Sequence, residues 1–205
     1  MFPEKKYNSS ENFVSDYFLE LQRASTSVDQ KEFSKAAELL INTYSRRKRL
    51  FVCGNGGSAA ISNHLVCDHG KLVSEGTVLL PRVTSLSNNI EVITAIANDI
   101  SYDEVFEFQL RLEAAAEDVL ITISSSGDSE NIIRACQWAK DNGLKLIALT
   151  GFTGGRSRRI ADIRLHVDAD NYGIVEDVHQ ALMHALAQYV KQKHLVNQSI
   201  DEGRF

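Results

Sequence analysis

Short apolar runs alternate with amphipathic segments along most of this chain. Runs typical of buried strands lie at residues 50–53, 77–85, 118–124, 144–150 and 162–167. Apolar residues at helical spacing follow at 89–97, 102–112, 130–141 and, in the longest segment, 175–194. Because the connections are long enough to be crossovers, the pattern predicts an α/β fold, with a doubly wound five-stranded parallel sheet and helices on both faces.

Two further amphipathic helices are predicted before the first strand, at residues 9–24 and 30–46. They have no strand of their own to cover, so we expect them to pack on the flank of the domain or on another subunit. The chain then divides into N-terminal helices for oligomerisation, residues 1–47, and an α/β domain, residues 48–198.

A glycine-rich loop follows the first predicted strand. Its sequence, Gly-Asn-Gly-Gly-Ser at residues 54–58, leads directly into a predicted helix. Backbone N–H groups at the start of a helix attract anions such as phosphate. Such turns also occur for purely geometric reasons, and this one matches neither the dinucleotide fingerprint nor the P-loop.

A serine-rich loop follows the strand at residues 118–124. Its sequence, Ser-Ser-Ser-Gly-Asp-Ser at residues 124–129, offers four hydroxyls at a helix start and no basic side chain. This composition favours a sugar phosphate held by neutral donors, although N-capping alone would explain one or two of the serines. Both loops leave the carboxyl ends of strands, where open α/β sheets bind their ligands.

Two helices carry side chains that could bind a metal ion or share a proton. His64 and Asp68 lie four residues apart and so share one helix face, as do Gln180 and His184 on the last helix. Glu176 lies two turns before His184. Two imidazoles with carboxylates favour zinc or iron over magnesium. The alternative is that these are ordinary surface or hydrogen-bonding residues, since the sequence alone does not bring position 64 beside position 184.

Composition and charge argue against a nucleic-acid-binding protein and against a membrane-spanning one. The net charge of −5 argues against a nucleic-acid-binding surface, and the short basic segment at 156–159 is expected to be a solvated loop. Three widely spaced cysteines in apolar runs predict buried free thiols in a reducing compartment. No run reaches the ~20 apolar residues of a membrane span, so we expect a cytoplasmic protein with no membrane partner. The histidines at positions 69, 166 and 194 have no comparable context.

Several motifs in order carry a resemblance to a known family. They are GNGGS at 54–58, His64 with Asp68, Ala-Asn-Asp at 97–99, SSSGDS at 124–129, Leu-Thr-Gly at 149–151 and His184 in the closing helix. With this spacing the chain resembles the sugar isomerase (SIS) domain family over nearly its whole length, and within it most resembles the phosphoheptose isomerases. The resemblance implies a flavodoxin-like parallel sheet preceded by two helices.

The resemblance also implies a homotetramer with active sites between subunits. It implies a divalent metal, zinc first, held by residues matching His64, Asp68, Glu176 and His184, with Asp68 and His184 as the catalytic acid/base pair. The implied substrate contacts are Asn55, Gly56, Gly57, Ser58, Asn98, Asp99, Ser124, Ser125, Ser126, Ser129 and Glu176.

The reaction implied is an aldose–ketose isomerisation through an enediol, from sedoheptulose 7-phosphate to D-glycero-D-manno-heptose 7-phosphate, in lipopolysaccharide or capsule biosynthesis. Three departures from the family pattern bear on it. In the first two, Asp68 replaces the family's Glu and Glu176 replaces its Gln. Leu72, Gly173 and Ile174 also stand where the family has an Arg and an Asp-Arg pair. These changes favour another sugar phosphate of surface-polysaccharide or nucleotide-sugar pathways as the alternative substrate.

A second interpretation is a non-catalytic protein of the same family. Some members bind other proteins, including a tetrameric factor that binds the bacterial replication initiator, and others are regulators that sense sugar phosphates. The carboxylate at Asp68 between His64 and His184 favours the enzyme, because a pure protein binder has no need of it.

Overall fold

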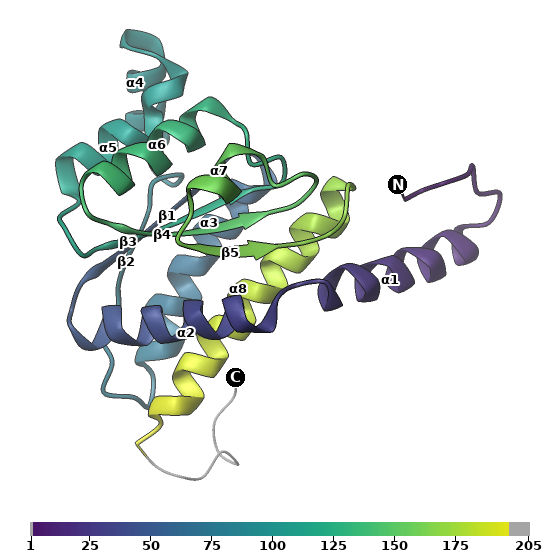
Figure 1. The fold of residues 1–205 in the computed structure, drawn as a ribbon, viewed down its shortest axis with the longest axis horizontal. Coiled ribbons are helices and arrows are strands. Elements are labelled where there is room, and N and C mark those ends of the chain that lie inside the picture. Colours follow the sequence, from purple (N-terminus) through teal and green to yellow (C-terminus); the bar gives the residue numbers. More distant parts are fainter. Residues whose placement is uncertain (1, 197–205) are drawn as a thin grey trace.

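Residues 2–196 are described by the structure, a computed structural model, and they form one parallel sheet between two layers of helices (Figure 1). The strands are β1 (Arg49–Gly54), β2 (Arg82–Ser85), β3 (Val119–Ser124), β4 (Lys145–Thr150) and β5 (Ile163–His166). Their order in the sheet is β2-β1-β3-β4-β5, and every neighbouring pair is parallel. The predicted fold class is confirmed, and strand order reverses between β1 and β3.

Helices cover both faces of this sheet (Figure 1). One layer holds α2 (Gln30–Ser45), α3 (Gly57–Cys67) and α8 (Tyr172–His194). The other holds α4 (Ile90–Asp99), α5 (Val105–Glu113), α6 (Glu130–Asp141) and α7 (Gly155–Ile160). A π-helix, η1 (Asp68–Leu72), continues α3, and a 3-10 turn, η2 (Tyr102–Glu104), precedes α5. The first helix, α1 (Ser10–Thr26), extends away from the sheet.

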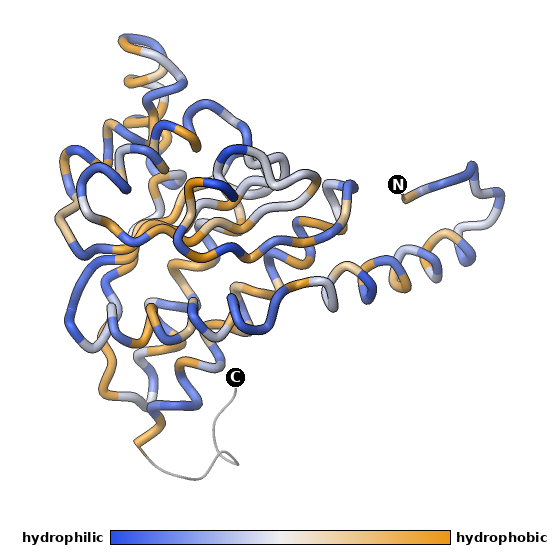
Figure 2. Tube along the Cα trace, viewed as in Figure 1, coloured by the Kyte–Doolittle hydropathy of each residue, from blue (hydrophilic) through white to orange (hydrophobic). Residues whose placement is uncertain are grey.

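Side chains of the central strands are buried alternately in two cores. From β1, Leu50 and Val52 pack with α2, α3 and α8, whereas Phe51 and Cys53 pack with α5 and α6. Figure 2 shows the strands as an apolar band at the centre of the molecule. Burial on both faces explains why these strands read as continuous apolar runs rather than alternating ones.

The predicted helices before the sheet pack in two different ways. α2 lies on the sheet, with Ala36, Leu40 and Tyr44 in the core beside β1 and α8. α1 packs on the first half of α8, where the Tyr17 hydroxyl donates to Asp177 Oδ2 at 2.6 Å. The proposed division at residues 47 and 48 stays a prediction, and its end at residue 198 lies outside the described residues.

Three local predictions are wrong. The strand predicted at 77–85 joins the sheet only over Arg82–Ser85, because Pro81 has no N–H to donate. The basic segment at 156–159 belongs to α7 instead of a loop, and Arg156 bonds to Asp128 and Glu130. The last helix begins at Tyr172 rather than at 175, because the side chain of Asn171 caps it.

The cysteines are free, as predicted, but they are not all buried. Cys53 and Cys136 lie in the core, whereas Cys67 is exposed at the end of α3, where the helix passes into η1. Within the described residues, no helix has the length and apolar character needed to span a bilayer.

Candidate active site

The end of α3 presents the first half of the site. His64 lies in its last turn and Asp68 opens η1, so both project from the same face. His64 Nε2 is 3.4 Å from Asp68 Oδ1. The Asp68 side chain is only 14% exposed, against 47% for His64, so the carboxylate lies in the floor of the site and the imidazole at its rim.

Helix α8 supplies the second half. His184 Nδ1 lies 2.6 Å from Asp68 Oδ2, and the rings of His64 and His184 meet edge to face with centroids 4.9 Å apart. Within residues 2–196, these three side chains form a group whose ligating atoms all lie within 4.8 Å of one another. Folding therefore brings position 64 beside position 184, which the sequence alone could not establish.

Gln180 completes the surroundings of the two rings. Its Nε2 lies 3.1 Å from His64 Nδ1 and 2.8 Å from His184 Nε2. An amide nitrogen can only donate, so both ring nitrogens facing it accept. The opposite nitrogens then carry the protons, and each points at one oxygen of Asp68. The sequence spacing places Gln180 beside His184 but gives it no role in the site.

Glu176 lies apart from this group. Eight residues along an ideal helix separate it from His184 by about 12 Å. Its carboxylate lies against α3 at Gly57, where a Cβ atom would collide with it, and it lines the serine pocket instead. Burial raises the pKa of Glu176, and the nearby Asp177 carboxylate adds to the effect.

The two loops predicted to bind phosphate face one cavity of about 130 Å³, which we call the serine pocket. It is lined by Asn55, Ser58, Ile123, Ser124, Ser125, Ser126, Ser129, Tyr172 and Glu176. The loops meet because β1 and β3 are adjacent parallel strands that end at the same edge of the sheet. Tyr172 was missed by sequence analysis, because the helix was predicted to begin after it.

N-capping does not account for all of these serines. Ser124 and Ser126 accept from the N–H groups of Gly127 and Asp128, at 3.1 and 3.3 Å, and so shape the loop. Ser129 occupies the N-cap position of α6, yet its side chain makes no capping bond. The Ser125 hydroxyl is buried and has no hydrogen-bond partner among the described residues. The pocket thus holds a donor available to a ligand.

The remaining predicted contacts divide between the pocket and the surface. Asn55 exchanges amide hydrogen bonds with Asn131, at 2.9 and 3.1 Å, and accepts from the Tyr102 hydroxyl at 2.9 Å. Asn98 and Asp99 are exposed at the end of α4, bonded to each other, and do not line the serine pocket. Gly56 has φ 56°, a conformation that favours glycine at this turn.

A second cavity, of about 450 Å³, gives access to the histidine cluster. Asp68 and His184 line it together with Cys67, Lys71, Leu72 and Gln188. A buried histidine lies directly behind this cavity, because His69 follows Asp68 and bonds to Tyr44 of α2. Burial lowers the pKa of His69 to about 4, so its ring is neutral near pH 7. Nothing in the sequence around His69 predicts a role for it.

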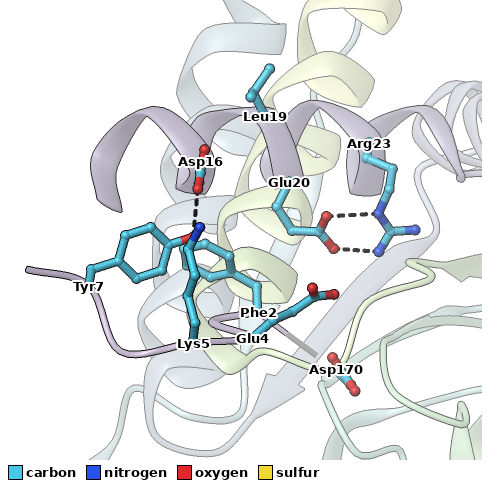
Figure 3. Close-up of a pocket in the computed structure, with 9 residues that line it drawn as sticks. All are labelled: Phe2, Glu4, Lys5, Tyr7, Asp16, Leu19, Glu20, Arg23 and Asp170. Carbon is cyan, nitrogen blue, oxygen red and sulfur yellow. Dashed lines mark hydrogen bonds and ion pairs between the residues drawn. The ribbon is translucent and has the colours of Figure 1, made fainter. Parts of the chain in front are cut away.

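The largest of the described cavities, about 570 Å³, lies elsewhere, between the N-terminal segment and α1 (Figure 3). Four of its polar side chains bond in pairs: Tyr7 donates to Asp16 at 2.7 Å, and Glu20 pairs with Arg23. Its lining contains no histidine or cysteine. Size alone therefore does not make it the active site.

Comparison with known proteins identifies the family. A sequence model of the SIS domain matches residues 15–151. Phosphoheptose isomerase of Helicobacter pylori is 35% identical over 173 residues, which cover 83% of this chain and 88% of that protein. The probable phosphoheptose isomerase of Thermoplasma volcanium is 34% identical over 177 residues, covering 86% and 90%.

Solved structures agree with these sequence matches. Phosphoheptose isomerase GmhA of Neisseria gonorrhoeae superposes with a TM-score of 0.81 at 30% identity, covering 89% of this chain and 98% of that one. The chain therefore belongs to the SIS domain family and, within it, to the phosphoheptose isomerases, which are sugar-phosphate isomerases.

Proposed function

We propose that this protein is a metal-dependent aldose–ketose isomerase that converts sedoheptulose 7-phosphate into D-glycero-D-manno-heptose 7-phosphate. The observation that carries the proposal is the 2.6 Å contact between Asp68 and His184, with His64 beside it. A carboxylate and an imidazole in contact are the groups that a proton transfer between adjacent carbons requires. The names of the similar proteins support the heptose phosphate as substrate.

The serine pocket is proposed to hold the phosphate of the substrate. It combines the start of α3, the start of α6 and the free hydroxyl of Ser125. Neutral donors at two helix starts bind a phosphate without a basic side chain. Binding at this end of the substrate orients the carbonyl end for reaction.

The donor set fits a zinc-type ion. His64, Asp68 and His184 offer two imidazoles and a carboxylate within 4.8 Å, and three protein ligands with an open position are usual for catalytic zinc. These three residues would hold the ion. When bound, it supplies Lewis-acid polarisation of the substrate carbonyl. The contribution of Glu176 as a fourth ligand remains a prediction, and Gln180 lies closer to both rings.

Asp68 and His184 then carry the protons. Asp68 takes the proton from C1 of the ketose while His184 gives one to the oxygen at C2, which forms the enediol. Asp68 returns its proton to C2 as His184 takes the proton of the C1 hydroxyl, which gives the aldose. Both side chains regain their starting states, so atoms and charge balance over the cycle.

A homotetramer with sites between subunits, acting in the cytoplasm in lipopolysaccharide or capsule biosynthesis, is part of the same proposal. Exposed apolar side chains on α1 support association, since Phe18 and Leu19 are 61% and 65% exposed. Asn98 and Asp99 lie outside the serine pocket of their own chain, which fits a site completed by a second copy.

The test is turnover by the purified full chain loaded with zinc. Sedoheptulose 7-phosphate would be supplied alone and beside a panel of other ketose phosphates, with product measured by a coupled assay and metal content measured in parallel. Turnover of sedoheptulose 7-phosphate supports the proposal. Turnover of a different ketose phosphate, without turnover of sedoheptulose 7-phosphate, would identify that compound as the substrate instead. No turnover on any of them and no bound metal would favour a non-catalytic SIS protein.

A further inference from the structure

A buried chain of hydrogen bonds runs behind the histidine cluster. The Tyr44 hydroxyl on α2 lies 2.7 Å from His69 Nδ1, and His69 Nε2 lies 3.3 Å from the carbonyl oxygen of Met183. The three residues are 1%, 0% and 0% exposed. We call Tyr44, His69 and the Met183 carbonyl the buried bridge.

The position of the buried bridge ties it to the site. His69 directly follows Asp68 in η1, and Met183 directly precedes His184 in α8. The bridge therefore joins the same two helices as the Asp68–His184 contact, one residue away from each partner. A π-helix has more residues per turn than an α-helix, so consecutive side chains diverge less and both Asp68 and His69 can face α8.

The proton positions follow from the partners. A carbonyl oxygen can only accept, so His69 Nε2 carries the hydrogen, and Nδ1 then accepts from the Tyr44 hydroxyl. Both ring nitrogens are satisfied. A leucine would fill a buried site without the cost of desolvating an imidazole, so packing alone does not call for this polar group. Hydrogen bonds are directional, and they fix the rotation and height of one helix against the other more sharply than apolar contacts do.

We propose that Tyr44 and His69 are positioning residues, which set the distance between Asp68 and His184 and thereby the affinity and geometry of the metal site. This inference rests on the metal site of the proposed function. It assigns a role to two residues that contact neither substrate nor metal.

The experiment measures cobalt(II) binding by the purified full chain, by titration and by the visible absorption of the bound ion. The apolar substitution His69→Leu removes the hydrogen bonds of His69 to Tyr44 and to the Met183 carbonyl. It is expected to weaken cobalt binding about 10-fold or more and to shift the absorption spectrum of the bound ion. Tyr44→Phe removes one bond and should have a smaller effect in the same direction. His69→Gln keeps an N–H that can reach the Met183 carbonyl, so it should restore most of the affinity.

The matched control is Tyr7→Phe, which removes a phenol hydrogen bond to Asp16 on α1. It should leave cobalt affinity and spectrum unchanged. Folded His69→Leu and Tyr44→Phe chains with wild-type affinity and spectrum would refute the inference and leave the proposed function intact. Should His69→Leu fail to fold, Tyr44→Phe decides, and equality with Tyr7→Phe refutes the inference. A wild-type chain that takes up no cobalt refutes the proposed metal site, and the inference falls with it.

Discussion

Asp68→Asn removes the charge of a side chain that is both the proposed base and a proposed metal ligand, while it changes the shape of that side chain little. The Asp68 side chain is 14% exposed, and its Oδ2 accepts from His184 Nδ1 at 2.6 Å. The carbonyl oxygen of an asparagine can accept the same hydrogen, so the helices keep one bond at this place. An amide has no basic oxygen, so it cannot take a proton from carbon. The substitution therefore separates the chemistry of Asp68 from its packing.

The expected magnitudes for activity and stability differ widely. General acid–base catalysis contributes about 10²–10⁴-fold, so kcat/KM should fall by about that factor. A hydrogen bond to a charged group contributes about 1.5–3 kcal/mol and a neutral one about 0.5–1.5 kcal/mol, so the folded state should lose about 1 kcal/mol. For a chain of this length that corresponds to about 2–4 °C in Tm.

The assay is kcat/KM in the coupled isomerase reaction, with Tm measured by circular dichroism on the same samples. Asp141→Asn is the matched control, because Asp141 makes the same kind of bond, to Gln137, on the exposed face of α6. The control should leave both quantities near wild type. An Asp68→Asn chain that keeps kcat/KM within about tenfold of wild type would show that Asp68 is not the base, since the expected loss starts at about 100-fold.

Three further predictions follow from other parts of the site. His184→Ala should abolish turnover while size-exclusion chromatography shows an unchanged oligomer; retained turnover would exclude His184 as the acid. Ser125→Ala removes a buried hydroxyl that has no partner, so it should raise the KM for sugar phosphate while Tm stays level or rises, and an unchanged KM would exclude Ser125 from the phosphate site. Burial, aided by Asp177, raises the pKa of Glu176 in the folded protein above its value in the unfolded chain. Glu176 therefore contributes to stability at pH values below its pKa in the unfolded chain, and this contribution is lost as the pH rises through its pKa in the folded protein. Glu176→Gln should therefore raise Tm at about pH 7 and change it little at about pH 4, and equal shifts at both pH values would contradict this reasoning.

The sequence was enough to predict the fold and one half of the site. Periodicity and the long connections predicted five parallel strands, because buried strands and amphipathic helices leave different patterns. The i, i+4 spacing placed His64 and Asp68 on one face, since that relation is local. The packing of η1 against α8 joins segments that are far apart in the sequence, and this packing decides which residue of α8 contacts Asp68.

The same limit explains what sequence analysis missed. Glu176 and Gln180 lie on one face of α8, one turn apart, so spacing alone could not tell which of them meets the histidines. The structure places Gln180 there and Glu176 in the serine pocket. His69 carried no signal either, because its partners Tyr44 and Met183 lie 25 and 114 residues away.

Two of the departures from the family pattern, Asp68 and Glu176, lie at different places in the fold. Asp68 is one methylene shorter than Glu, which withdraws the carboxylate by about 1.5 Å. It nevertheless contacts His184 at 2.6 Å, at the point where α3 passes into a π-turn that the buried bridge joins to α8.

Glu176 changes the charge of the serine pocket, which its carboxylate lines. An ionised carboxylate there repels a phosphate dianion. The raised pKa of Glu176 favours the neutral acid, which does not repel the phosphate in this way. Phosphate binding should favour the protonated form further, by the same repulsion. Proton uptake at Glu176 is then coupled to substrate binding, so apparent affinity for sugar phosphate should fall as pH rises, and the fall should be smaller in Glu176→Gln. If KM changes with pH in the same way in the wild-type and Glu176→Gln proteins, the Glu176 carboxylate does not lie beside the bound phosphate.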